Sequence, residues 1–220
     1  MKTCHWRSGK LHFLFGTIDP AFEGLGESDV LPIRWTAAAI LGNRKGNLMI
    51  RKLVRKEFDS VFQMLETSFP EDEYRTYDEQ KALLDHTAYE IYVLPDSDEA
   101  TIKAFIAVWK FDSFTLFEHF AVNPTYRNHG IGSEFLGELV RMLGKMVCLE
   151  VEPPNNEIAS RRIGFYQLNN FFLNKYPYMQ PPISAGRNPV PLLIMTYGRS
   201  IDHTEFAKMK EVLFTQVYHQ

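Results

Sequence analysis

The most informative part of this sequence runs Phe117-Glu118-His119-Phe120-Ala121-Val122-Asn123-Pro124-Thr125-Tyr126-Arg127-Asn128-His129-Gly130-Ile131-Gly132-Ser133. It reads as a strand, then a loop, then the start of a helix. A helix N-terminus leaves backbone N–H groups without intrahelical partners, and the helix dipole favours negative charge there. Gly130 and Gly132 let the backbone approach a ligand closely, and Arg127 adds a charged fork. These residues alone fit either a plain strand-to-helix turn, which is common beside a glycine pair, or a phosphate or pyrophosphate site.

Two common nucleotide-binding motifs are excluded for this stretch. No Lys-Ser or Lys-Thr pair follows Gly132, as a P-loop would require. A Rossmann fingerprint would need a third glycine at a fixed spacing after a parallel strand, whereas the strands before this loop are expected to be antiparallel.

Hydrophobic periodicity on both sides of the stretch alternates between strands and helices. Turn residues at Pro95-Asp96-Ser97-Asp98 and at Asp112-Ser113 favour an antiparallel meander of three strands. The predicted class is α/β, with a mixed, mostly antiparallel central sheet flanked by helices. Strands are expected at about 49–54, 89–94, 102–110, 114–122, 146–151, 171–175 and 191–197, and helices from Phe58 to before Pro70 and at about 77–86, 131–144, 157–169 and 203–218.

Length and composition limit the possible classes of protein. The chain has 220 residues, 45% of them apolar, and its net charge of −3 lowers the expectation of a nucleic-acid binder. The two cysteines, Cys4 and Cys148, cannot build a disulfide framework or a metal site with Cys-x-x-Cys spacing. The longest other apolar run, Trp35 to Leu41, is far shorter than the roughly 20 residues that span a bilayer. We therefore expect a cytoplasmic protein without membrane, nucleic-acid or metal partners.

The chain changes character near Met49. Residues 1–48 lack a sustained period and are expected to be an N-terminal extension, disordered or a segment packed on the domain. Residues 49–199 form the predicted domain, and residues 200–220 supply a C-terminal helix that packs on it. The late strands could also pair across a homodimer.

Two motifs resemble those of a known family. Ala121-Val122-x-Pro124-x-x-Arg127-x-x-Gly130-Ile131-Gly132 resembles the acyl-CoA-binding motif of the GNAT superfamily of N-acetyltransferases. The stretch Leu149 to Asn156, with Ala159, Arg162, Ile163, Phe165-Tyr166 and Phe171, resembles that family's second motif. The resemblance covers about 49–199. It implies a GNAT-like fold and transfer of the acetyl group of acetyl-CoA, the co-substrate, to a primary amine of a small molecule or peptide by direct attack in a ternary complex.

The resemblance also assigns site residues. The backbone of Phe120 and Val122 would pair with the pantetheine arm, and the loop Arg127 to Ser133 would hold the pyrophosphate. Tyr166 matches the tyrosine that protonates the departing thiolate, a role that suits a phenol. The implied cofactor-binding residues are Phe120, Ala121, Val122, Arg127, Asn128, His129, Gly130, Ile131, Gly132, Ser133, Asn156 and Tyr166.

The attacking amine must be neutral, so a base or a base acting through water is expected. Glu118 is the first choice, because many family members place a carboxylate near the start of this strand. Glu152, at the end of the next strand, is second and is also expected on the substrate side. Strand alternation predicts that Glu118 and Phe120 share one face and His119 the other. Neither His119 nor His129 is expected to be catalytic.

Further observations concern the end of the fourth helix, the acceptor and the type of reaction. Asn170 stands where the family usually has a glycine before Phe171, and asparagine is the next-best residue for a left-handed helix stop. The acidic run Glu71-Asp72-Glu73 would favour a cationic acceptor, or it is a solvated face. The alternative functions are a non-catalytic acyl-CoA sensor and transfer from a different acyl-CoA. Cys148 lies in an apolar strand, so no acyl-cysteine step is expected.

Overall fold

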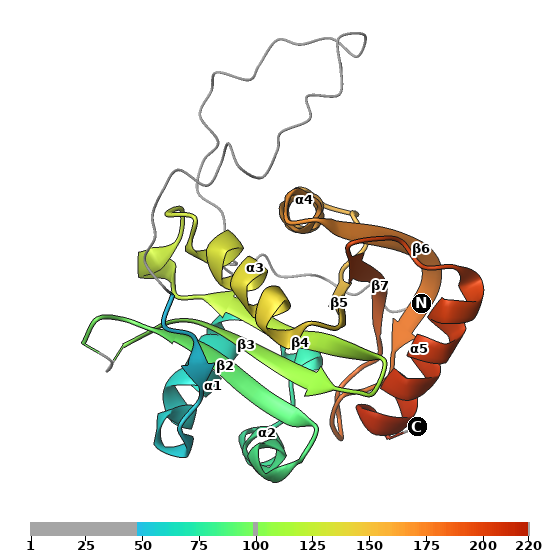
Figure 1. Ribbon diagram of the computed structural model, residues 1–220. Coiled ribbons are helices and arrows are strands. Elements are labelled where there is room, and N and C mark those ends of the chain that lie inside the picture. Colours follow the sequence, from blue (N-terminus) through green and yellow to red (C-terminus); the bar gives the residue numbers. More distant parts are fainter. Residues whose placement is uncertain (1–47, 99–100, 220) are drawn as a thin grey trace, which may run out of the picture.

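The computed structural model describes residues 48–98 and 101–219. These residues form a seven-stranded sheet in the order β1-β2-β3-β4-β5-β7-β6, with helices on both faces (Figure 1). All neighbouring strands are antiparallel except β4 and β5, which are parallel. The predicted α/β class with a mostly antiparallel sheet is therefore confirmed. The proposed extension 1–48 lies, apart from Leu48, outside the described residues.

The elements follow the sequence periodicity closely. The strands are β1 (Arg51–Lys52), β2 (Tyr89–Pro95), β3 (Ile102–Lys110), β4 (Phe114–Val122), β5 (Met146–Val151), β6 (Phe171–Gln180) and β7 (Val190–Tyr197). The α-helices are α1 (Phe58–Ser68), α2 (Tyr77–Ala82), α3 (Ile131–Leu143), α4 (Glu157–Leu168) and α5 (His203–Gln216). Short 3₁₀ turns occur at Arg55–Glu57, Glu71–Glu73, Leu83–Asp85 and Pro124–Tyr126.

Three elements differ from the predicted ranges. The first strand shrinks to two residues, because Val54 already precedes a 3₁₀ turn. The helix predicted to reach residue 86 ends at Ala82 and continues as a 3₁₀ turn. Strand β6 runs on to Gln180, with its register shifted between Asn174 and Tyr178. Pro177 lies within this shift and lacks an N–H group for the ladder, which hides the continuation from a reading of the sequence.

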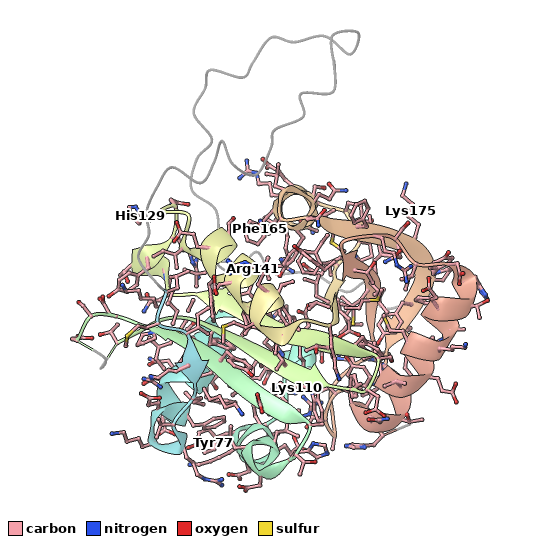
Figure 2. The ribbon with its side chains drawn as sticks, viewed as in Figure 1. Tyr77, Lys110, His129, Arg141, Phe165 and Lys175 are labelled. Atoms are coloured by element: carbon pink, nitrogen blue, oxygen red, sulfur yellow. The ribbon has the colours of Figure 1, made fainter. Side chains whose placement is uncertain are left out.

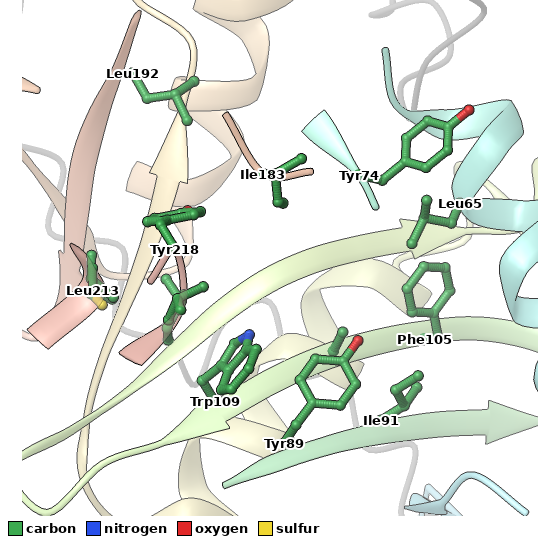
Figure 3. Close-up of a cluster of buried hydrophobic side chains, with 14 of the residues drawn as sticks. Leu65, Tyr74, Tyr89, Ile91, Phe105, Trp109, Ile183, Leu192, Leu213 and Tyr218 are labelled. Atoms are coloured by element: carbon green, nitrogen blue, oxygen red, sulfur yellow. The ribbon is translucent and has the colours of Figure 1, made fainter. Parts of the chain in front are cut away.

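The sheet separates two apolar cores, and alternate residues of β3 enter each of them. Phe105, Ala107 and Trp109 face the core that α1 and α5 cover, part of which Figure 3 shows. Ala104, Ile106 and Val108 face the core that α3 and α4 cover. In Figure 1, α3 and α4 lie on one side of the sheet and α1 and α2 on the other. A sheet that is buried on both faces explains the almost continuous apolar sequence of β3.

Strands β4 and β5 separate halfway along their length, and this creates the central opening of the fold. Their pairing runs only from Phe114 opposite Met146 to Phe117 opposite Leu149. Beyond that point β4 continues to Val122 while pairing with β3 alone. Within the described residues, one edge of the second half of β4 thus has no neighbouring strand.

A β-bulge coincides with this separation. Ala107 lies opposite His119 and Val108 opposite Phe117, so Glu118 is the additional residue in β4. The prediction that Glu118 shares a face with Phe120 was wrong. Glu118 pairs with Arg75, and His119 packs against Phe69 after α1, so both side chains lie on the α1–α2 side. The additional residue interrupts the alternation that the prediction assumed.

Candidate functional site

The diverging strands enclose a wedge-shaped cavity, which we call the wedge. It lies where β4 and β5 part, and the connection between α1 and α2 and the ends of β6 and β7 close it. Its lining residues are Ser68, Phe69, Glu73, Phe117, Glu118, His119, Phe120, Leu149, Glu150, Glu152, Arg162, Tyr166, Gln180, Ile183 and Leu192. Four of these carry carboxyl groups, an unusual density for a largely enclosed space.

A second cavity lies at the start of α3, and we call it the loop cavity. It is lined by Phe120, Val122, Tyr126, Arg127, Asn128, Gly130, Ile131, Gly132, Ser133 and Phe165. Most of the residues that the sequence assigned to cofactor binding are therefore brought together here. Phe120 lines both cavities, which places them next to each other along the open edge of β4.

The start of α3 has the geometry of an anion site. Gly130 is the N-cap, with φ of 77° in the left-handed region, and Asn128 has φ of 70°. The bond from the Glu134 N–H to the Gly130 carbonyl opens the helical ladder. The N–H groups of Ile131 and Gly132 lie before Glu134 in the first turn, where backbone N–H groups have no acceptor within the helix. They can therefore donate hydrogen bonds to an anion.

Arg127 is half-buried beside this helix start. Its Nε donates a hydrogen bond of 2.9 Å to the carbonyl of Val122, which fixes the guanidinium at the end of β4. Partial burial lowers the pKa of Arg127. The Val122 carbonyl is therefore occupied by a side chain, whereas the sequence analysis assigned the Val122 backbone to a cofactor arm.

Gly132 and Phe165 shape the inner end of the loop cavity. A Cβ atom at Gly132 would lie 3.6 Å from the side chains of Phe120, Phe165 and Val122. Figure 2 shows Phe165 between α3 and α4 and His129 on the outer loop. His129 is exposed and does not line either cavity.

Tyr166 lies on α4 and lines the wedge. It is 7% exposed and packs against the rings of Phe165 and Phe171. Burial raises the pKa of Tyr166 to about 12, and the charge of Arg162 partly opposes this effect. The phenol therefore keeps its proton at neutral pH and is available as a donor inside the cavity.

Glu118 also lines the wedge, but it is held by a cation. Its Oε1 accepts a hydrogen bond of 2.8 Å from Arg75 Nη1, and the two side chains are only 3% and 7% exposed. Burial, the largest single effect, favours the neutral acid, but the charge of Arg75 and bonds from His119 and Arg75 outweigh it. The net result lowers the pKa of Glu118 to about 2, so this carboxylate is a weak proton acceptor at neutral pH.

The carboxylates of β5 also have partners. Glu152 accepts a hydrogen bond of 2.9 Å from Arg162 of α4. Glu150 accepts one of 2.7 Å from the hydroxyl of Tyr218, while its other oxygen is buried without a hydrogen-bond partner among the described residues. Burial raises the pKa of Glu150, and the charge of Glu118 adds to this effect.

Glu73 is the site residue whose position the sequence analysis missed. It belonged to an acidic run, Glu71-Asp72-Glu73, that was considered only as a charge feature. In the structure Glu71 pairs with Arg187 at 3.0 Å, and Asp72 accepts hydrogen bonds from Asn188. Glu73 alone lines the wedge, and its carboxylate has no hydrogen-bond or ion-pair partner in residues 48–98 and 101–219.

The remaining predicted positions lie outside both cavities. Asn156 is the N-cap of α4, where its side-chain oxygen accepts a hydrogen bond of 2.8 Å from the N–H of Ala159. Asn170 has φ of 66°, so the predicted left-handed stop after α4 is confirmed. Cys148 is fully buried, which raises the pKa of its thiol well above the ordinary value. No group of three or more His, Cys, Asp or Glu side chains suited to a metal ion occurs in the described part of the chain.

The comparisons with known proteins agree with this geometry. The model of the GNAT acetyltransferase family matches residues 56–171. A GNAT-family protein from Bacteroides thetaiotaomicron is 32% identical, with a TM-score of 0.70 over 78% of this chain and 98% of that chain. No curated protein matches the sequence.

Two more distant structures share the fold. The ribosomal-protein-S18-alanine N-acetyltransferase of Escherichia coli is 18% identical, with a TM-score of 0.52 over 70% of this chain and 94% of that chain. A Salmonella typhimurium protein described as an acetyltransferase, solved with its cofactor acetyl-CoA, is 16% identical, with a TM-score of 0.50 over 71% and 97%.

The family model covers more than half of the chain, and the Bacteroides protein exceeds 30% identity over most of it. The stretch that the family model matches includes β4, α3 and β5. The chain is a member of the GNAT acetyltransferase family.

Proposed function

We propose that the protein is an N-acetyltransferase that moves the acetyl group of acetyl-CoA to a primary amine of a small molecule or peptide by direct attack. Membership of the family implies acyl transfer from an acyl-CoA. One observation carries the finer proposal. A cavity at a helix N-terminus adjoins, through Phe120, a second cavity that holds Tyr166 and several carboxylates.

The loop cavity suits the phosphates of acetyl-CoA. Backbone N–H groups at Ile131, Gly132 and Ser133 offer donors at the positive end of the α3 dipole. Arg127 adds positive charge, and the open edge of β4 next to Phe120 can receive an extended arm. The bound co-substrate would supply a thioester as the acyl donor.

The wedge suits the reacting end of the complex. Tyr166 keeps its proton at neutral pH and would donate it to the departing sulfur. Phe120, which lines both cavities, and Tyr166 of the wedge would flank the thioester and limit its contact with water. We propose a positioning role for Glu118, because Arg75 holds its carboxylate in a buried pair.

The charge of the wedge favours a cationic acceptor. Its lining contains the carboxyl groups of Glu73, Glu118, Glu150 and Glu152, and two guanidinium groups balance part of this charge, Arg162 at Glu152 and Arg75 at Glu118. An excess of negative charge in a water-poor cleft attracts and orients ammonium groups. Glu152, next to Arg162, is the carboxylate we assign to acceptor binding.

Two expectations about the wider molecule stay proposals. Every helix within the described residues is too short or too polar to cross a bilayer. We retain the prediction of a cytoplasmic enzyme that acts without a metal.

Thiol release from acetyl-CoA, measured with a panel of primary amines, tests this function. We expect wild-type protein to release thiol with at least one cationic amine, and Tyr166→Phe to lower kcat by roughly 100-fold or more while leaving acetyl-CoA affinity unchanged. A sensor would bind acetyl-CoA without any thiol release. Competition by other acyl-CoA compounds would reveal a different donor.

A further inference from the structure

Glu73 stands apart from the other carboxylates of the wedge. Glu118 is paired with Arg75, Glu152 with Arg162, and Glu150 accepts a hydrogen bond from Tyr218. The Glu73 carboxylate faces the same cavity, but residues 48–98 and 101–219 give it no hydrogen-bond or ion-pair partner. Unpaired carboxylates in enclosed cavities are rare and costly, so this one calls for a functional explanation.

The backbone around Glu73 is fixed even though its carboxylate is not paired. The carbonyl oxygen of Glu73 lies 2.9 Å from Nε2 of His119 in β4. The two preceding acidic residues hold the connection between β6 and β7, through Arg187 and Asn188. The segment is thus attached on both sides of the wedge, which keeps the Glu73 side chain in place for a ligand.

Tyr166 and Glu73 approach the wedge from opposite layers of the molecule. Tyr166 comes from α4 on one face of the sheet, whereas Glu73 comes from the connection between α1 and α2 on the other. Both line the one cavity that opens between β4 and β5. A proton donor and a proton acceptor on two sides of a narrow cavity match the needs of amine acetylation, which moves one proton off nitrogen and another onto sulfur.

We infer that Glu73 is the general base that deprotonates the acceptor ammonium in this wedge; the inference rests on the proposed acetyltransferase function. Glu73 takes one proton from R–NH₃⁺, and the freed electron pair of nitrogen forms the N–C bond to the acetyl carbon. Tyr166 gives its proton to sulfur as the C–S bond breaks, and the electron pair of that bond goes to sulfur. The nitrogen returns its second proton to Tyr166, and Glu73 releases its own to solvent.

The electrostatics of the site support this role. Burial and the charges of Glu152 and Glu150 raise the pKa of Glu73 to about 7, although Arg162 and His119 oppose the increase. A base whose pKa is close to the working pH combines a large deprotonated fraction with good proton affinity. Glu118, with a pKa of about 2, does not meet this requirement.

Two variants and a matched control test the inference. Glu73→Gln keeps the size of the side chain and removes the base, and Glu73→Asp keeps a carboxylate but withdraws it by one methylene. Glu66→Gln removes the same charge from the exposed surface of the neighbouring helix α1, outside the wedge. Circular dichroism and calorimetric titration with acetyl-CoA would verify that each variant is folded and binds the co-substrate.

The kinetic readout is the pH profile of kcat/KM with 1,4-diaminobutane, or with the best amine of the thiol-release panel. We expect wild type and Glu66→Gln to gain activity as pH rises through about 7. In Glu73→Gln, this rise of kcat/KM with pH, which we call the basic limb, should disappear, and kcat/KM should fall by at least roughly 100-fold. Glu73→Asp should restore part of the basic limb and part of the rate. The inference would be overturned if Glu73→Gln kept a kcat/KM within a few-fold of wild type and an unchanged pH profile. It would also be overturned if Glu150→Gln lost the basic limb while Glu73→Gln kept it.

A second readout does not depend on turnover. In protein labelled with ¹³C at the glutamate carboxyl carbons, one resonance should titrate with a midpoint near 7 and be absent in Glu73→Gln. If that resonance belongs to another residue, Glu73 is not the base. If wild type binds acetyl-CoA but acetylates no amine, the proposed function itself fails, and this inference fails with it.

Discussion

The ion pair of Arg75 and Glu118 stabilises the fold and also keeps the Glu118 carboxyl group ionised. Their ion pair is almost completely enclosed, and Arg75 also donates a hydrogen bond to the carbonyl of Val217 after α5. Removing only one member of a buried pair leaves an uncompensated charge. Glu118 therefore belongs to the framework that holds α5 and the start of α2 against β4.

Arg75→Met should accordingly destabilise the protein by about 3–5 kcal/mol at neutral pH. The lowered pKa of Glu118 stabilises the folded state fully above about pH 4.5, and this contribution is lost as pH falls toward about 2. In urea unfolding, the difference between wild type and variant should therefore shrink below pH 4.5. A difference that is constant with pH would argue against the ion pair.

Glu73 should act on stability in the opposite direction. Its pKa is raised from 4.5 to about 7, so the folded state binds the proton more tightly and loses stability as pH rises between these values. Glu73→Gln should raise the free energy of unfolding at pH 8, by at most about 3 kcal/mol, and have little effect at pH 4. Equal stability of the two proteins at pH 8 would contradict a raised pKa of Glu73 in the folded state.

Among the helices and strands, the end of α4 provides a direct test of backbone conformation. Asn170 has φ of 66°, and its carbonyl accepts a hydrogen bond from the N–H of Gly198 after β7. Asn170→Ala should cost about 1 kcal/mol, because a Cβ without a compensating polar group disfavours this conformation. Asn170→Gly should be neutral or slightly stabilising by thermal unfolding. A stable alanine variant would show that the turn tolerates other conformations.

Periodicity and turn residues were sufficient to locate most elements. The β2–β4 meander was predicted almost to the residue, because its strands are apolar and are separated by turn residues such as Asp112-Ser113. The bulge at Glu118 could not be predicted, since neither a glycine nor a proline marks the additional residue.

The site was predictable where it follows local sequence and not where it follows tertiary packing. The glycine-rich start of α3 and Tyr166 on α4 belong to contiguous motifs. Glu71, Asp72 and Glu73 look alike in the sequence, and only the position of the β6–β7 connection shows which one faces the wedge.

For the molecule as a whole, strand β6 at the edge of the described sheet leads to a prediction about assembly. Strand β6 forms one edge, and its Phe172 and Met179 are 42% and 50% exposed. An edge strand with exposed apolar side chains favours pairing with a second strand. The monomer mass is 25.5 kDa. We expect sedimentation velocity to give twice this mass for wild type and the monomer mass for Phe172→Lys. A monomeric wild type would end the homodimer prediction.

We propose that the two cavities and the gap between β4 and β5 together accommodate one molecule of acyl-CoA. Calorimetric titration of purified protein with acetyl-CoA examines this organisation without knowledge of the acceptor. We predict binding of one molecule per chain, lost in a folded double variant, Arg127→Ala with Gly130→Asp, that places a carboxylate at the start of α3. Folded wild-type protein that does not bind acetyl-CoA, or a double variant that binds it equally well, would contradict the account.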